Sequence, residues 1–127
     1  VARRWKSQFN EIAKAWAQCE FLPEADHNTL AGTQQPAPQL DHAVALFLQS
    51  SFDHPRNRLR SEFTRKALMV EGFSTDFFEA KGDTPLAHLW TLLHFGDYTS
   101  YYLAMLYGVD PTPIAALAHF KDEMSKA

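Results

Sequence analysis

The stretch HAVALFLQS, residues 42–50, decides the fold predicted for this chain, because it is a near-continuous apolar run of strand length. Such runs are typical of strands covered on both faces of a parallel sheet. A second run, FSTDFFEAK at residues 73–81, is rich in phenylalanine and β-branched residues and also reads as a strand. A helical segment separates the two, and this order predicts an α/β domain with a parallel sheet, in which 42–50 is a central strand.

The helix between these strands has recognisable ends in the sequence. Asp53 is the expected N-cap, Pro55 stands in the first turn, and Gly72 is the expected stop. Its core face is expected to carry four apolar side chains: Leu59, Phe63, Ala67 and Val70. The pattern therefore predicts one amphipathic helix packed on the sheet.

The chain before the first strand begins with another helical pattern, expected over residues 2–17. Four side chains fall on one face at helical spacing: Trp5, Phe9, Ile12 and Trp16. The run CEFLP, residues 19–23, is a possible short buried strand that its proline would end. EADHNTLAG, residues 24–32, is expected to be a loop entering a short helix capped by Asp26 or Asn28. Residues 33–39 are expected to form a loop, because they contain two prolines among polar side chains.

The C-terminal third is expected to be helical. Residues 84–107 predict a long helix that is apolar on most of its circumference and therefore substantially buried, with Gly108 at its end. Within it, Asp97, Tyr98 and Tyr101 form a polar cluster that needs hydrogen-bond partners. A last helix is expected after Thr112 as cap, with Pro113 at its first position.

Composition favours a single globular domain. The 127 residues are 46% apolar and 13% aromatic, which is enough for a sizeable core. The formal charge of −3 gives no general attraction to nucleic acid or to an anionic membrane. The single cysteine, Cys19, and the lack of an apolar run of membrane-spanning length favour a soluble, cytoplasmic protein. Because the chain starts inside a helical pattern without methionine, we expect it to be a fragment of a longer protein.

Pattern alone gives the candidate functional residues ordinary interpretations. Glu11 is expected to pair with Lys14 on a solvated helix face, and His27 reads as a surface histidine in a loop. The basic residues between 56 and 66 suggest a nucleic-acid surface, but they fit a solvated helix face better: Arg56, Arg58, Arg60, Arg65 and Lys66. His88 and His94 are six residues apart, which is not a helical zinc spacing.

Three separated stretches together resemble the C-terminal half of the bifunctional phosphoglucose/phosphomannose isomerases, members of the sugar isomerase (SIS) superfamily. They are RWKSQFNEIAK at residues 4–14, LPEADHN at 22–28 and GDYTSYYLAMLYGVDPTP at 96–113. FDHPRNRLR, residues 52–60, also looks like the family's segment after a central strand. The resemblance spans essentially the whole chain and implies a three-layer α/β/α SIS-like domain that is incomplete at its N-terminal side.

The resemblance also implies roles for particular residues. In that family a glutamate in the first motif is the catalytic base and a histidine in the second opens the sugar ring, and these roles fall on Glu11 and His27. A lysine near the C-terminus belongs to the family's active site, and Lys121 is the best match, with His119 or a shifted register as alternatives. Thr112 matches a threonine thought to help the site accept mannose as well as glucose phosphate.

The implied activity is an aldose–ketose isomerisation without metal or organic cofactor, in a cytoplasmic enzyme of carbohydrate metabolism. The loops that grip the sugar phosphate belong mainly to the family's N-terminal SIS domain, and the site lies at a homodimer interface. We therefore expect two partners besides the sugar phosphate substrate: the N-terminal SIS domain of the same protein and a second copy of the protein. We expect neither nucleic acid nor a membrane as a partner.

Two departures from the family stand beside the histidine. Asp26 and Thr29 replace an amide and a carboxylate of the usual LNHNE motif, and Ile12 replaces an asparagine of the first motif. These departures leave open an alternative function, in which the domain binds a sugar phosphate for regulation without catalysis.

Overall fold

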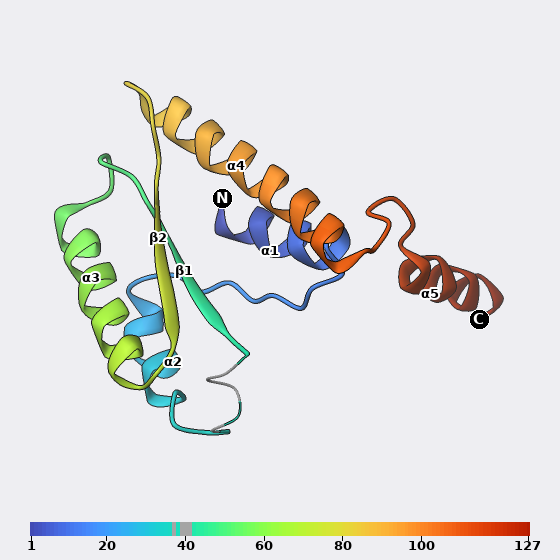
Figure 1. Ribbon diagram of the computed structural model, residues 1–127, viewed down its shortest axis with the longest axis horizontal. Coiled ribbons are helices and arrows are strands. Elements are labelled where there is room, and N and C mark those ends of the chain that lie inside the picture. Colours follow the sequence, from blue (N-terminus) through green and yellow to red (C-terminus); the bar gives the residue numbers. More distant parts are fainter. Residues whose placement is uncertain (37, 39–41) are drawn as a thin grey trace. The chain divides into compact units, whose positions relative to one another are not determined.

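The computed structural model describes residues 1–36, 38 and 42–127 (Figure 1). Its contacts divide the chain into two compact units. One unit holds residues 3–18 and 93–127 together with Val1, and the other holds residues 19–92 together with Ala2. The elements are, in chain order, α1 (Ala2–Glu11), the 3₁₀ helix η1 (Glu24–Asp26), α2 (Asn28–Ala31), β1 (Val44–Gln49), α3 (Pro55–Val70), β2 (Ser74–Glu79), α4 (Pro85–Tyr107) and α5 (Ala115–Lys126).

The unit of residues 19–92 is built on a β-α-β arrangement. Strands β1 and β2 lie side by side and parallel, in a register that runs from Val44 opposite Ser74 to Gln49 opposite Glu79 (Figure 1). Helix α3 connects them and packs against both strands. The α/β class and the parallel pairing predicted from the sequence are confirmed, while the central position of β1 in a wider sheet stays a prediction.

The face of α3 that meets the sheet differs from the predicted one. Ser61, Thr64 and Leu68 are the buried residues of this helix. Phe63 is 58% exposed and Val70 is 86% exposed, so the predicted apolar face is largely open. Small hydroxyl side chains occupy the buried face where large apolar ones were expected. One of them is hydrogen-bonded to the sheet, since Gln49 Nε2 donates to Ser61 Oγ at 3.0 Å. Hydrophobic spacing selected the wrong face, since the packing uses small polar residues there.

Both ends of α3 lie where the sequence predicts them, but the residue that caps its start differs. Pro55 occupies the first turn as expected, but the N-cap is His54, whose Nδ1 accepts a hydrogen bond from the Arg56 N–H at 3.2 Å. The predicted cap, Asp53, instead accepts from the Ser50 N–H at 2.7 Å and so closes the turn before the helix. Gly72, with a φ of 100°, follows the end of the helix as predicted.

The segment before β1 contains no strand at residues 19–23. The carbonyl groups of Phe21 and Pro23 accept from Ala25 and Asp26, so they serve the local turn of η1 and not a sheet ladder. Helix α2 follows, with His27 at its N-cap and no side-chain cap among the described residues. The predicted capping role of Asp26 or Asn28 is therefore wrong, because both are engaged elsewhere, as described below. Of the loop predicted at 33–39, residues 37 and 39 lie outside the described residues.

In the other unit, α1 ends six residues earlier than predicted. The helix ends at Glu11. Asn10 Oδ1 accepts a hydrogen bond from the Ala17 N–H at 2.7 Å, so the chain after the helix folds back toward Asn10. Lys14 has a φ of 56°, which no α-helix accommodates. Trp16 consequently lies outside the helix and is 85% exposed, so its predicted place on the core face is wrong.

The contact between α1 and α4 depends on Trp5, which is buried. Its ring lies 5.9 Å from that of Phe9 and 6.0 Å from that of Phe95, centroid to centroid. Gly96 faces the indole so closely that a Cβ at this position would overlap Trp5 side-chain atoms. The two helices therefore approach each other at a position where only glycine fits.

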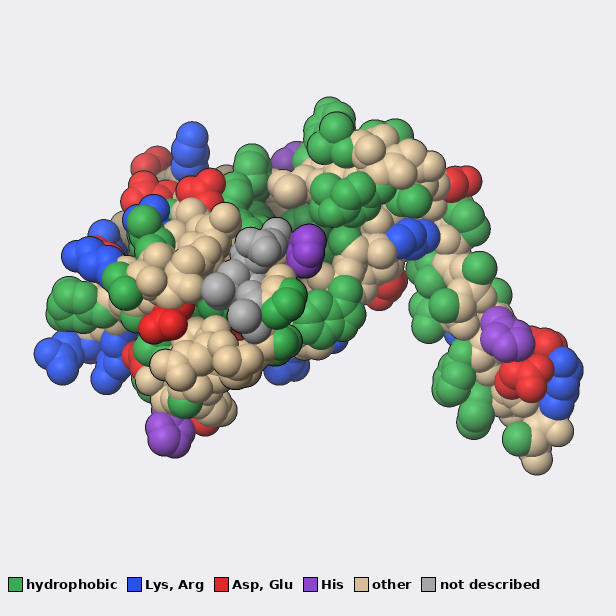
Figure 2. Space-filling model, turned by 60° about the horizontal axis from the view of Figure 1, so that its bottom comes forward, with side chains coloured by type: hydrophobic (Ala, Val, Ile, Leu, Met, Phe, Trp, Pro, Cys, Tyr) green, Lys and Arg blue, Asp and Glu red, His purple; other side chains and the backbone are tan. Residues whose placement is uncertain are grey.

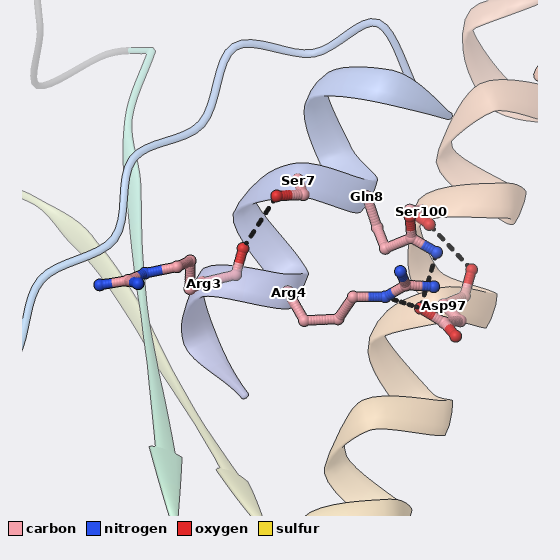
Figure 3. A network of polar contacts seen from close by, with 6 residues as sticks. All are labelled: Arg3, Arg4, Ser7, Gln8, Asp97 and Ser100. Carbon is pink, nitrogen blue, oxygen red and sulfur yellow. Dashed lines mark hydrogen bonds and ion pairs between the residues drawn. The ribbon is translucent and has the colours of Figure 1, made fainter.

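A polar network lies beside this contact (Figure 3). Asp97 Oδ1 accepts from Gln8 Nε2 at 2.8 Å and from Arg4 Nε at 3.4 Å. The expectation that Asp97 has structural hydrogen-bond partners is confirmed. Tyr98 and Tyr101, from the same predicted cluster, are exposed.

Helix α4 has the predicted extent and ends at Gly108, whose φ is 66°. Its predicted burial is wrong, because many of its large side chains are exposed, among them Leu86, Leu89, Trp90, Tyr102, Leu106 and Tyr107. The last helix, α5, begins at Ala115 with Ile114 as N-cap, so Thr112 and Pro113 precede it and the predicted cap is also wrong. The reason is local, because the Thr112 N–H is held by Asp110 Oδ1 at 2.8 Å in the preceding turn.

Candidate functional site

Glu11 is the last residue of α1 and is exposed. Its carboxylate makes no hydrogen bond or ion pair with the described residues. The predicted ion pair with Lys14 does not form, because Lys14 Nζ donates to the Glu11 backbone carbonyl at 2.6 Å. The Glu11 backbone carbonyl is thus held by Lys14, while the carboxylate is exposed.

Lys14 also connects Glu11 to the DPTP segment. Its Nζ donates to the Pro111 carbonyl at 3.2 Å, next to Thr112. The structure therefore links the backbone at Glu11, through one ammonium group, to the residue that precedes Thr112. Sequence reasoning missed this role of Lys14, and its position in the NEIAK motif was the only signal that could have suggested it.

His27 lies in the other unit, between η1 and α2, and its side chain is exposed. Its backbone N–H donates to the Glu24 carbonyl at 3.0 Å, and Glu24 Oε1 accepts from Asn28 Nδ2 at 3.1 Å. Ala25 is buried beneath the same turn. The turn that carries His27 is thus well bonded, while the imidazole makes no hydrogen bond within the described part of the chain.

Asp26, beside His27, is directed toward α3. Its Oδ1 accepts from Thr64 Oγ1 at 2.6 Å, and its Oδ2 lies 3.4 Å from Arg60 Nε. These two contacts could not be predicted from the sequence, since they join residues 34 and more positions apart and only the fold brings them together. The carboxylate that departs from the family motif is therefore a link between η1 and α3.

Lys121 lies on α5, all of whose residues are exposed. Figure 2 shows hydrophobic side chains open to solvent along α5, and Leu117, Phe120 and Met124 are its exposed large apolar residues. Lys126, further along, donates to Asp122 at 2.6 Å and to Glu123 at 3.2 Å, and these bonds raise the pKa of Lys126. Lys121 has no such partner among the described residues, so its ammonium group remains available.

The basic segment of α3 divides into two groups. Arg56, Arg58 and Lys66 are exposed, as predicted for a solvated face. Arg65 is half-buried instead, because its Nε donates to Thr75 Oγ1 at 3.0 Å and its guanidinium lies 4.9 Å from the centre of the Phe77 ring. Arg60 is held as described above and lines a shallow pocket of about 190 Å³ with Arg56, Leu59 and Phe63.

A buried histidine that sequence reasoning left unassigned lies at the carboxyl ends of the strands. His88 Nε2 is 2.8 Å from the Gly82 carbonyl, so this nitrogen carries a hydrogen, and Nδ1 faces Ser50 Oγ at 2.8 Å. The ring of Phe52 lies 4.8 Å away, edge to face. His88 therefore ties together the loops that follow β1 and β2. Within the described residues, no three His, Cys, Asp or Glu side chains gather as metal ligands would.

The parallel β-α-β arrangement is that of an α/β domain, and the family can be stated from sequence comparison. The family model of the bacterial phospho-glucose isomerase C-terminal SIS domain matches residues 1–124. The chain belongs to this family, which confirms the resemblance inferred from its motifs.

Curated relatives carry the name bifunctional phosphoglucose/phosphomannose isomerase. The relative from Aquifex aeolicus (strain VF5) is 36% identical over 126 residues, which are 99% of this chain and 39% of the relative. The relative from Caldicellulosiruptor bescii is 32% identical over 99% of this chain and 37% of its own length. The relative from Thermoplasma acidophilum is 35% identical over 98% of this chain and 38% of its own length. The chain thus spans less than two-fifths of each of these relatives.

No helix in the described part of the chain combines the length and apolar character needed to cross a bilayer.

Proposed function

We propose that the full-length protein containing this chain interconverts glucose 6-phosphate, and also mannose 6-phosphate, with fructose 6-phosphate through a cis-enediol. The observation that carries the proposal is the family match over residues 1–124, which includes all four residues assigned by resemblance. The names of the relatives support the same reaction class. The free side chains of Glu11 and His27 are compatible with it.

Glu11 is proposed as the base that moves the proton between C1 and C2. One carboxylate on one face of the sugar can remove a proton from either carbon and return it to the other. The end of α1 suits this task, because Trp5 anchors the helix and Lys14 holds the Glu11 carbonyl, while the carboxylate itself is exposed.

His27 is proposed to open the sugar ring. The substrate arrives mainly as a closed ring, so a proton must move between the ring oxygen and the anomeric hydroxyl. A histidine exchanges protons near neutral pH and can serve as both acid and base in this step. The exposed imidazole on a well-bonded turn meets both requirements.

Lys121 and Thr112 are proposed as supporting residues. The ammonium group of Lys121 adds positive charge near the developing enediolate or assists ring opening. Thr112 is proposed to help the site accept mannose phosphate as well as glucose phosphate. The preceding SIS domain and a second copy of the protein are the proposed partners that complete the site, and no metal or organic cofactor is needed for these proton transfers.

The experiment that tests this proposal compares Glu11→Gln with wild type in the full-length protein. Conversion of fructose 6-phosphate to glucose 6-phosphate is followed by a coupled dehydrogenase assay. Loss of a general base lowers rates by about 10²- to 10⁴-fold, so we expect kcat to fall by that factor. Glu62→Gln, an exposed glutamate on α3, is the matched control and should keep wild-type kcat.

Two results would contradict the proposal. Unchanged turnover in Glu11→Gln would remove Glu11 as the base. Wild-type protein that binds sugar phosphate in calorimetry without converting it would favour the regulatory function instead, which the replacements at Asp26 and Thr29 permit.

A further inference from the structure

Asp26 is held by α3 through two contacts that reach the residue directly before His27. Thr64, which is 6% exposed, donates from Oγ1 to Asp26 Oδ1 at 2.6 Å. Arg60 Nε lies 3.4 Å from Asp26 Oδ2, and Arg60 Nη1 donates to Asn57 Oδ1 at 3.3 Å. Both oxygens of the carboxylate therefore face one helix.

The single hydroxyl proton of Thr64 has two acceptors in reach. One is Asp26 Oδ1, and the other is the Arg60 carbonyl of its own helix at 2.8 Å. A hydroxyl donates more strongly to a carboxylate than to a neutral carbonyl, and 2.6 Å is a typical length for such a charge-assisted bond. Thr64 therefore donates its hydroxyl hydrogen to Asp26, and this hydrogen bond joins α3 to η1.

The consequence concerns His27, because adjacent Cα atoms are held about 3.8 Å apart by the planar peptide bond. The turn cannot move Asp26 away from α3 without breaking the partly buried hydrogen bond from Thr64. The backbone bond from His27 to Glu24 and the buried Ala25 fix the turn on its other side. The position of the His27 Cα is thus set relative to α3, while its imidazole stays free.

We propose that Thr64, with support from Arg60, is a positioning residue for His27 in ring opening. This inference rests on the proposed function, in which His27 acts on the closed sugar. Thr64 touches no substrate in this scheme and acts only through Asp26. Its contribution is to hold the turn at the point where the imidazole meets the ring oxygen and the anomeric hydroxyl.

The same arrangement accounts for the departure from the usual asparagine of the motif. An asparagine at position 26 would donate from Nδ2 to Thr64 Oγ1, and the Thr64 proton would then go to the Arg60 carbonyl, which is already at 2.8 Å. A hydrogen bond would still join η1 to α3, with Thr64 Oγ1 as its acceptor and no longer as its donor. Thr64 is therefore compatible with either residue, whereas a side chain without a hydroxyl would satisfy neither.

The test uses the pair Thr64→Val and Thr64→Ser in the full-length protein. Valine keeps the shape and loses the hydroxyl, whereas serine keeps the hydroxyl and loses a methyl group. Two substrates separate ring opening from proton transfer: fructose 6-phosphate, and its analogue without the C5 hydroxyl, which cannot close a furanose ring. Isomerisation of the first is assayed directly, and that of the second by exchange of its C1 hydrogen with deuterated water.

We expect Thr64→Val to lower kcat for fructose 6-phosphate by about 10- to 100-fold, the effect typical of a misplaced acid–base group. Exchange on the open-chain analogue should stay within about twofold of wild type, because this reaction needs Glu11 and not His27. Thr64→Ser and Asp26→Asn keep the hydrogen bond and should retain turnover of fructose 6-phosphate, and Arg58→Gln, an exposed neighbour on α3, should resemble wild type.

Three results would overturn the positioning role. They are equal losses on both substrates in Thr64→Val, a loss in Thr64→Ser as large as in Thr64→Val, and unchanged ring-dependent turnover in Thr64→Val. Equal losses would show that Thr64 supports the fold in general. Wild-type protein inactive on both substrates would overturn the proposed function and this role with it, so the two failures are distinguishable.

Discussion

The two units hold their proposed catalytic residues by different kinds of contact. Glu11 stands at the end of a helix that is anchored by an aromatic side chain, because Trp5 of α1 is buried against Phe95 and Gly96 of α4. His27 stands on a short turn that is anchored by hydrogen bonds, because Asp26 is held by Thr64 and Arg60. One residue is placed by shape and the other by polar bonds.

This difference predicts which kind of substitution destabilises each unit. Close packing resists any change of volume, so the Glu11 helix should respond strongly to a single added methyl group. A hydrogen-bonded turn loses about 1 kcal/mol for each bond removed and more when a buried group is left unpaired. We therefore expect the largest single effects on stability in the unit of α1 and α4.

The sharpest test of this comparison is Gly96→Ala. Replacing glycine by alanine in a helix interior ordinarily stabilises it by roughly 0.5–1 kcal/mol. Here the new Cβ would overlap the Trp5 indole, so we expect a loss of about 1–3 kcal/mol. Hydrogen exchange of the α1 amides in the full-length protein should accelerate by about tenfold or more.

Gly32→Ala is the control for that substitution, because the nearest atom to its Cβ would be 3.6 Å away, an ordinary contact. It should leave exchange in α1 unchanged. A Gly96→Ala protein as stable as wild type would show that the helix contact tolerates added volume, and the contrast between the two units would then fail.

A smaller effect is expected when the polar network beside Trp5 is cut. Asp97→Ala removes the acceptor of Gln8 and Arg4, and we expect a loss of about 1–2 kcal/mol in urea unfolding of the full-length protein. Gln8→Ala should account for more of this loss than Arg4→Ala, because the Gln8 bond is shorter and Arg4 is about half exposed. The reverse order would mean that charge, and not the amide bond, holds the two helices.

The smallest predicted effect concerns the start of α3, in the unit held by polar bonds. His54→Ala removes the side chain that caps the helix, and such caps are worth about 0.5–2 kcal/mol. We expect a loss near the lower end of this range, together with faster hydrogen exchange at the Arg56 amide. Asp53→Ala should not affect that amide, since Asp53 binds the Ser50 N–H. Faster hydrogen exchange at the Arg56 amide in Asp53→Ala alone would show that Asp53 is the cap, as predicted from the sequence.

The positions of β1, β2, α3 and α4 were predictable, but the buried faces of the two helices were not. Continuous apolar character identified β1, a composition rich in phenylalanine and β-branched residues identified β2, and proline and glycine marked both ends of α3 and the end of α4. These signals are local, so a single sequence contains them. The buried face of α3 depends on which side chains meet the sheet, and Ser61 and Thr64 are buried where a count of apolar residues favours Phe63.

The candidate site shows the same division. Motifs alone named Glu11, His27, Thr112 and Lys121, and the family match supports the motif resemblance on which those assignments depend. They could not reveal Lys14 bonded to the carbonyl groups of Glu11 and Pro111, because the two carbonyls are a hundred residues apart along the chain. Nor could they show that α1 stops at Glu11, which follows from Asn10 folding the chain back onto itself.

The sequence by itself determined the family of this protein and its α/β class, and it named the residues that are proposed for catalysis. These depend on residue identity and on spacings of a few positions, which every copy of the chain carries whether folded or not. The tertiary structure alone decided how Glu11 and His27 are held, because Trp5 against Gly96 and Thr64 against Asp26 are contacts between distant segments. Such contacts exist only once the backbone brings those segments together.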